Sequence, residues 1–137
     1  MPALAATGRG AARVVATDGC PAAVRSAQAV IARNAAAGAR CDCEARRLAW
    51  EEPPEPGSAK AWAFVLFADV VYNDGAAEIL ASAVEALLAE GGVALGAVGL
   101  LRVGAADIFP AMRRRGFAAT EVAVSEGVLA SASAAAA

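Results

Sequence analysis

The sequence predicts an α/β fold, in which parallel strands form a layered sheet and helices pack against it. Three observations carry this prediction. Residues 63–68 contain no polar side chain, residues 76–90 repeat apolar side chains at helical spacing, and segments of these two kinds alternate along the chain. Strands that alternate with helices usually pair in parallel. At 137 residues, the chain has the length of a single domain.

The first part of the chain is predicted to contain two strands with a helix between them. These segments are residues 12–16, 21–37 and 41–46, in the order strand, helix, strand. Pro21 suits the first turn of the helix, and Gly38 supplies its stop. The first strand closes on an acidic turn at Asp18, and the second strand leads to Leu48 and Trp50. Asp18 and Trp50 therefore follow the carboxyl ends of two successive strands.

The second part is predicted to contain three strands with helices between them. They are expected at residues 63–68, 76–90, 93–101, 105–115 and 117–125, in the order strand, helix, strand, helix, strand. The apolar run at residues 63–68 could instead be a buried helical turn. However, the helix and strand breakers Asn73-Asp74-Gly75 that follow it favour a strand. Its composition predicts burial on both faces. Gly91-Gly92 are expected to end the first helix, and Pro110 to begin or kink the second.

Composition restricts the possible classes of function. The net charge is −2 and acids and bases are interspersed along the chain, so no nucleic-acid surface is indicated. The run Arg113–Arg115 is typical of a solvated last helical turn rather than a phosphate site. No apolar stretch reaches the roughly 18 residues of a membrane span. Three cysteines without histidine argue against a zinc site, and the odd number is typical of reduced thiols in the cytoplasm, with the nucleus as an alternative.

Asp69 and Tyr72 are the first candidates for a functional role. They follow the apolar run, at the carboxyl end of a central strand, where ligands bind in open parallel sheets. The residues leave open a second interpretation, in which Asp69 only caps a turn and Tyr72 only packs. Asp18 lies where many nucleotide-binding folds hold ribose hydroxyls. Asn34 either caps a loop or touches a ligand, and Trp50 belongs either to the core or to a cleft wall.

With these residues at successive strand ends, the chain resembles the seven-stranded, class I S-adenosylmethionine-dependent methyltransferases. Within them it is most similar to the methyltransferase-like protein-lysine methyltransferases. The matching segments are FVLFADVVY (64–72), VVATDG (14–19), ARNAAAGA (32–39), Leu48 with Trp50, and RRRGF (113–117). The resemblance implies a Rossmann-like, mostly parallel sheet over residues 1–125. Residues 126–137 are an Ala/Ser-rich tail without periodicity.

The resemblance also implies a cofactor, a substrate and site residues. The cofactor would be S-adenosylmethionine, without a metal, and the substrate a lysine-bearing protein. The positions implied for the cofactor are Asp18, Asn34, Trp50 and Ala68. Among them Asp18 would bind the ribose, and Trp50 would pack on the adenine side. Asp69 would face the lysine ammonium with Tyr72 beside it, as the catalytic pair.

Parts of the family pattern have no counterpart in this sequence. The first strand with its glycine-rich loop is missing, and the last hairpin strand has no convincing candidate. We therefore expect a sheet truncated at its amino end. Unless the strands that end at Asp18 and Asp69 rejoin, their edges expose unpaired backbone groups. The two main hypotheses are a protein-lysine methyltransferase and a non-catalytic homologue that acts as a binding module. A dehydrogenase-like domain is a third, although no glycine fingerprint follows a strand.

Overall fold

The computed structural model describes residues 6, 9–36, 42–52, 54–55, 57–99 and 101–122. Strands and helices alternate within these residues, which confirms the predicted α/β class. The elements are β1 (Arg13–Asp18), α2 (Pro21–Ala36), β2 (Asp42–Arg47), β3 (Trp62–Ala68), α3 (Ala76–Leu87), β4 (Leu88–Ala97), η1 (Ala105–Asp107) and α4 (Ile108–Arg114). No helix in this part of the chain combines the length and the apolar character that a membrane crossing requires.

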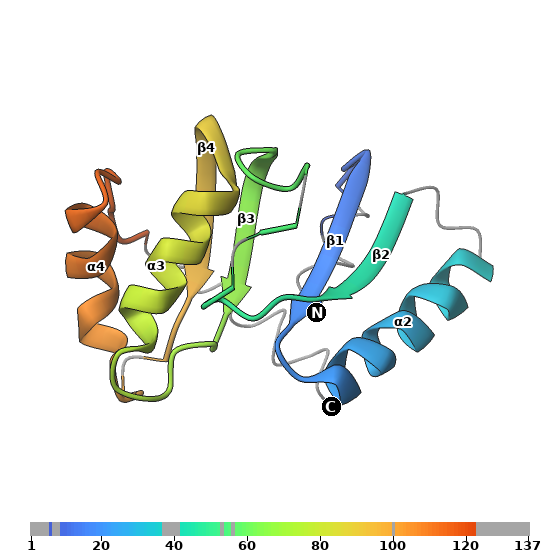
Figure 1. Ribbon diagram of the computed structural model, residues 1–137, viewed down its shortest axis with the longest axis horizontal. Helices are drawn as coiled ribbons and strands as arrows, with labels where there is room; N and C mark the ends of the chain where they lie inside the picture. The colour runs from blue at the N-terminus through green and yellow to red at the C-terminus, as the bar shows by residue number, and fades with distance from the viewer. Residues whose placement is uncertain are drawn as a thin grey trace.

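The strands form two separate parallel pairs, β1 with β2 and β3 with β4. Figure 1 shows the pairs side by side, with β1 and β3 innermost, α2 next to β1 and β2, and α3 and α4 next to β3 and β4. Within the described residues, no strand pairs with the inner edge of either β1 or β3. The predicted unpaired edges are thus confirmed for this part of the chain, and the arrangement is compatible with part of a Rossmann-like sheet.

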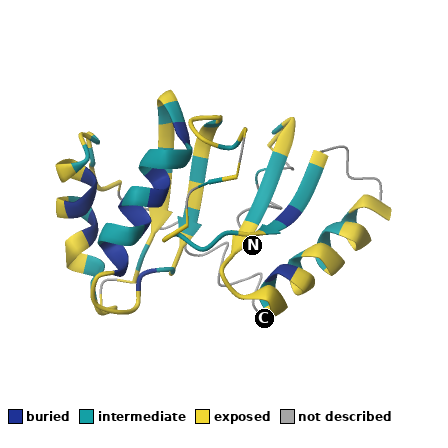
Figure 2. Ribbon diagram, viewed as in Figure 1, coloured by how far each residue is buried: buried dark blue, intermediate teal, exposed yellow. Residues whose placement is uncertain are grey.

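The hydrophobic core lies around α3 and α4. Its buried side chains form one cluster: Val71, Ala76, Ala77, Leu80, Ala81, Val84, Leu88, Ile108, Ala111 and Met112. Val65 and Phe67 of β3 pack against this cluster. Of the described residues outside it, the buried hydrophobic ones are Val24, Ala45 and Ala83. Figure 2 shows the same contrast, with most buried positions on α3 and α4 and few on β1, α2 and β2.

Local sequence explains where α3 and α4 begin. Gly75 has a φ of 79°, a left-handed conformation that glycine adopts without steric cost, and this residue leads the chain into α3. The α4 helix starts at Ile108, so Pro110 falls in the first turn, where no intrahelical N–H is required. Of the two predicted effects of Pro110, the structure shows a helix start rather than a kink.

The end of α3 differs from the prediction. The helix ends at Leu87 instead of Glu90, and the chain passes directly into β4. Leu88 already pairs with Trp62 of β3, so a tertiary contact ends the helix before Gly91-Gly92 is reached. The register between the strands shifts just after this pair, and the two glycines lie in the irregular part of β4.

The prediction that the apolar run is buried on both faces is wrong. One face packs on α3, but Phe64 is 67% exposed and Leu66 is 40% exposed on the other. In the register of β3 and β4, these residues lie beside Val93 and Leu95, which are also exposed. No described helix covers these four side chains, because α3 packs on the opposite face and α4 packs against α3.

The last predicted strand, residues 117–125, is not formed in its described part, residues 117–122. After α4, the Gly116 N–H donates to the Arg113 carbonyl at 3.0 Å, and the Phe117 N–H donates to the Met112 carbonyl at 3.1 Å. Phe117 then packs against the core cluster. These capping bonds turn the chain back over α4 instead of leading it along a strand. The predicted tail, residues 126–137, lies outside the described residues.

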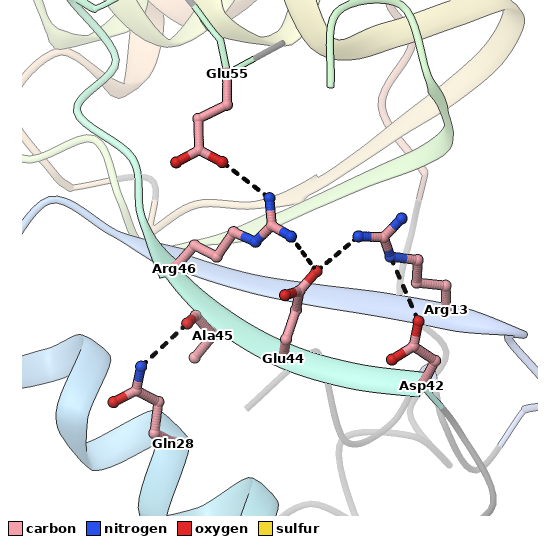
Figure 3. A network of polar contacts seen from close by, with 7 residues as sticks. All are labelled: Arg13, Gln28, Asp42, Glu44, Ala45, Arg46 and Glu55. Carbon is pink, nitrogen blue, oxygen red and sulfur yellow. Dashed lines mark hydrogen bonds and ion pairs between the residues drawn. The ribbon is translucent and has the colours of Figure 1, made fainter. Parts of the chain in front are cut away.

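A network of ion pairs connects β1, β2 and the loop before β3 (Figure 3). Glu44 of β2 binds Arg13 at 2.8 Å and Arg46 at 2.9 Å, and Arg46 reaches Glu55 at 2.8 Å. The Arg13 guanidinium also lies over the ring of Trp62 in β3, 5.6 Å from its centre. Charged and cation–π contacts, rather than ladder hydrogen bonds, therefore link the two strand pairs.

Acid should weaken this network. Hydrogen bonds, first from Arg13 and then from Arg46, hold the pKa of Glu44 below its ordinary value of 4.5. A carboxylate with a lowered folded-state pKa stabilises the fold above its unfolded pKa, and the stabilisation is lost as the pH falls through the folded pKa. We expect Glu44→Gln to lower the melting temperature by at most a few degrees at neutral pH. Below the folded pKa, the variant and the wild type should melt together.

Thermal melts over a pH series test this expectation. Glu90→Gln is the matched control, since Glu90 is exposed and has no ion pair to a described residue. It should follow the wild type at every pH. A Glu44→Gln difference that stays constant down to the lowest pH would show that the ionised carboxylate is not what stabilises the network.

Candidate functional site

The chain leaves the sheet at Asp69, directly after β3. The Asp69 N–H still donates to the Ala97 carbonyl at 2.8 Å, which extends the ladder between β3 and β4 by one residue. Asp69 then has a φ of 50°, a left-handed conformation that aspartate tolerates better than most residues. Ala68, the last residue of β3, is exposed beside it. Asp69 therefore lies at the carboxyl end of the strand, as predicted.

Arg102 binds the carboxylate of Asp69 through both of its oxygens. The Arg102 Nε atom donates to Oδ1 at 2.9 Å and Nη2 donates to Oδ2 at 2.5 Å. Both side chains are about half exposed. The hydrogen bond from Arg102 lowers the pKa of Asp69 below its ordinary value of 3.8, so the carboxylate is ionised at neutral pH. Asp69 is thus half of an ion pair, and within the described part of the chain its carboxylate is bound by Arg102.

Tyr72 is 64% exposed on the segment that begins at Asp69. Val71, directly before it, is completely buried in the core cluster and anchors the segment to α3 and α4. Because Val71 takes the inward position, the ring of Tyr72 faces solvent. The interpretation in which Tyr72 only packs does not fit this exposure.

Asp18 ends β1 and begins the turn into α2. Its Oδ1 accepts a hydrogen bond from the Cys20 N–H at 2.8 Å, which stabilises this turn. Its backbone carbonyl accepts a hydrogen bond from the Leu48 N–H at 3.1 Å, and this bond brings the segment after β2 next to the end of β1. Asp18 is exposed, and its Oδ2 has no hydrogen bond to a described residue. One oxygen is used by the turn, and the other remains available to a ligand.

Trp50 lies in the loop after β2 and borders a hollow of about 410 Å³ between this loop and α3. The residues that line the hollow are Leu48, Trp50, Glu51, Glu52, Pro54, Ser82, Ala83, Ala86 and Leu87. Trp50 is half-buried and also packs against the core cluster. It therefore combines the two roles that the sequence left open, because one part of it contacts the core and another part forms the wall of the hollow.

Asn34 lies apart from these residues. Its Nδ2 donates to the Val30 carbonyl of the same helix at 2.8 Å. The helix starts at Pro21, close to Asp18, and Asn34 is about 20 Å farther along its axis at 1.5 Å per residue. The structure does not bring Asn34 to the strand ends, and its support of a cleft stays a prediction.

Asp18 and Ala68 end β1 and β3, Asp69 and Tyr72 follow β3, and we refer to these four residues as the carboxyl edge. In Figure 1, the connection from β1 to α2 lies on the same side of the molecule as the carboxyl ends of β3 and β4. Ligands of open parallel sheets bind outside such ends. Among the described residues, no group of three or more cysteine, histidine or acidic side chains is arranged to hold a metal. The carboxyl edge offers a ligand the carboxylates of Asp18 and Asp69 and the exposed ring of Tyr72.

Comparison with protein families shows which family the chain belongs to. The model of the lysine methyltransferase family matches residues 3–112. The chain belongs to the lysine methyltransferase family. Comparison with curated proteins and with solved structures gave no match. The family match includes the whole carboxyl edge and Arg102, and it extends into α4.

Lysine methyltransferases of this family type use S-adenosylmethionine in general, and two parts of that molecule fit residues of this chain. The exposed Asp18 carboxylate has an oxygen that can accept hydrogen bonds from ribose hydroxyls. The hollow beside Trp50 offers an aromatic ring and apolar side chains, which suit a purine base. The contact between Asp18 and Leu48 connects the two features, since Leu48 lines the same hollow.

Proposed function

We propose that this chain is an S-adenosylmethionine-dependent methyltransferase that modifies a lysine side chain of a protein. The family match over residues 3–112 carries the proposal. The positions of Asp69 and Tyr72 at the carboxyl edge support it, because both are accessible to a substrate. The cofactor supplies a methyl group on a sulfonium ion. The lysine nitrogen gains this methyl group as the carbon–sulfur bond breaks, and a proton leaves the nitrogen to solvent.

Such a transfer needs little covalent chemistry from the protein. The amine must be held in line with the carbon–sulfur bond and shielded from water, so the residues act mainly by positioning. In our proposal, Asp18 and Trp50 hold the cofactor, while Asp69 and Tyr72 receive the lysine side chain. The exposed ring of Tyr72 can attract a cationic lysine by roughly 0.5 to 2 kcal/mol.

Two measurements test this function. Calorimetric titration of the folded chain with S-adenosylmethionine should show binding in the micromolar range, after circular dichroism has confirmed the fold. Radiolabelled cofactor should then transfer its methyl group to lysine-bearing peptides and not to the same peptides with arginine in place of lysine. Because Lys60 is the single lysine of the chain, Lys60→Arg removes self-labelling at lysine. Binding without transfer to any lysine peptide or protein extract would contradict the proposed activity.

The second candidate is a non-catalytic family member that acts as a binding module. Two observations favour it: Arg102 already engages both oxygens of Asp69, and no described strand joins β1 to β3. A stably folded chain that binds neither S-adenosylmethionine nor S-adenosylhomocysteine would decide for this candidate and against the enzyme.

A further inference from the structure

We propose that Arg102 cancels the charge of Asp69, so that the acceptor site selects a neutral amine over an ammonium ion. This inference rests on the proposed function and deepens it. The neutral amine is the form that reacts, because a protonated nitrogen has no lone pair to attack the methyl group. Arg102 is thus a specificity-determining residue that acts through Asp69, and it need not touch the methyl group itself.

The geometry of the pair is that of a two-point contact. Two nitrogens of one guanidinium bind the two oxygens of one carboxylate, at 2.9 and 2.5 Å. Guanidinium groups prefer this planar, paired contact to a carboxylate, and arginine keeps its charge at every pH at which proteins fold. Among the described residues, Arg102 is the charged group that acts on Asp69. The pair therefore presents a net charge of about zero to a substrate.

The backbone around Arg102 holds it in this position. The Arg102 N–H donates to the Gly99 carbonyl at 3.0 Å, and the Arg102 carbonyl accepts a hydrogen bond from the Ala105 N–H at 3.1 Å. A methyl group added at Gly99 would lie 3.4 Å from the Arg102 Cγ atom and 3.9 Å from Asp69 Oδ1. Both distances are ordinary van der Waals contacts, so the backbone at position 99 lies directly beside the ion pair. Because β3 and β4 are parallel neighbours, the segments that follow them begin at the same edge.

This charge balance removes the preference for the ammonium form of lysine that an unpaired Asp69 carboxylate would give the site. A lysine ammonium near Asp69 is attracted by the carboxylate and repelled by the guanidinium bound to it. A neutral amine has no such repulsion, and it can donate an N–H to a second lone pair of either carboxylate oxygen. The half-exposed position of the pair allows a third group to approach. A bare carboxylate would do the opposite, because it would stabilise the ammonium and delay its deprotonation.

Small amines of different charge test the inference without requiring methyl transfer. At neutral pH, n-butylamine is cationic, whereas trifluoroethylamine is uncharged because its fluorines lower the pKa of the amine. Binding of each to the full chain can be followed by the NMR signal of the Asp69 carboxylate carbon. Arg102→Gln should tighten the binding of n-butylammonium by roughly two- to fivefold and leave that of trifluoroethylamine unchanged. Arg102→Lys keeps the positive charge but not the two-point contact, so it should lie closer to the wild type than Arg102→Gln does.

Arg113→Gln is the matched control for the loss of an arginine. Arg113 contacts the Phe109 ring and the Ala119 carbonyl and makes no contact with Asp69. It should leave the binding of both amines as in the wild type. If Arg102→Gln weakens the binding of both amines equally, Arg102 only orients the carboxylate, and the inference is overturned. The same holds if Arg102→Gln changes neither amine.

Kinetics separate the inference from the proposed function. With a lysine peptide, Arg102→Gln should lower KM and lower kcat at neutral pH, because the substrate binds more tightly in its unreactive protonated form. Suppose that no variant transfers a methyl group, but that Arg102→Gln tightens the binding of n-butylammonium and leaves that of trifluoroethylamine unchanged. The proposed enzyme then fails, and the charge selection at Asp69 stands. If methyl transfer occurs but Arg102→Gln does not change the binding of the two amines differently, the proposed enzyme stands and the charge selection fails.

Discussion

Asp69→Asn is expected to lower methyl transfer to lysine by about a hundredfold or more, while the affinity for S-adenosylmethionine changes little. Asparagine keeps the size of the side chain and one oxygen acceptor, but it removes the charge that balances Arg102. The guanidinium is then left without its carboxylate partner at the acceptor site. It repels the ammonium form of lysine, and the amine loses one of its two hydrogen-bond acceptors.

The measurements are kcat/KM with a lysine peptide and calorimetric binding of S-adenosylmethionine. Asp74→Asn is a suitable control, because Asp74 is an exposed carboxylate shortly after Asp69 with no hydrogen bond or ion pair to a described residue. It should retain wild-type kinetics. Full activity in Asp69→Asn would remove Asp69 from the acceptor site. An equal loss of cofactor binding would place its role on the cofactor instead of on the lysine.

Gly104→Ala is expected to destabilise the fold by about 2 to 4 kcal/mol. Gly104 has a φ of 79°, and an added Cβ would lie 2.8 Å from the Asn73 carbonyl oxygen and 3.2 Å from a methyl carbon of Val71. The nearest atom belongs to the backbone, so it cannot move aside as a side-chain end could. The substitution therefore combines backbone strain with a clash against the segment that carries Tyr72.

Gly116→Ala separates these two causes. Gly116 has a similar φ of 83°, but an added Cβ would meet no atom within 4 Å. In this variant, backbone strain alone should lower the free energy of unfolding, by about 1 to 2 kcal/mol. Urea denaturation of both variants gives the comparison. Equal losses would show that strain alone explains Gly104 and that the contact with residues 71 and 73 does not contribute.

The order of the elements was predictable because each has a strong local pattern. The apolar run at 63–68, the helical spacing after Ala76 and the glycines between segments all act over a few residues. The end of α3 was not predictable in this way, because it depends on the pairing of Leu88 with Trp62. The prediction that Phe64 is buried failed for a related reason. An apolar strand can be buried on both faces, but its own sequence does not tell whether a helix covers each of them.

The site shows the same distinction between local and distant contacts. The strand pattern correctly predicted Asp18 at the end of β1 and Asp69 and Tyr72 just after the end of β3. The partner of Asp69 was missed, since Arg102 lies 33 residues later and no local pattern joins the two. The available clue was that both residues follow neighbouring parallel strands. Asn34 was assigned to the cofactor site through family resemblance. Its distance from the strand ends depends on how far along α2 it lies, which the strand pattern does not predict.

The uneven distribution of the core has a consequence for how the molecule opens. Amide protons of α3 and β4 should exchange slowly with solvent, because the cluster around Leu80 and Val84 must come apart first. Those of β1, α2 and β2 should exchange faster, since Val24 and Ala45 are their buried hydrophobic residues. Asp18 belongs to this less protected region. A cofactor bound there would slow exchange most in β1 and α2, because binding stabilises the folded form of the region that holds it.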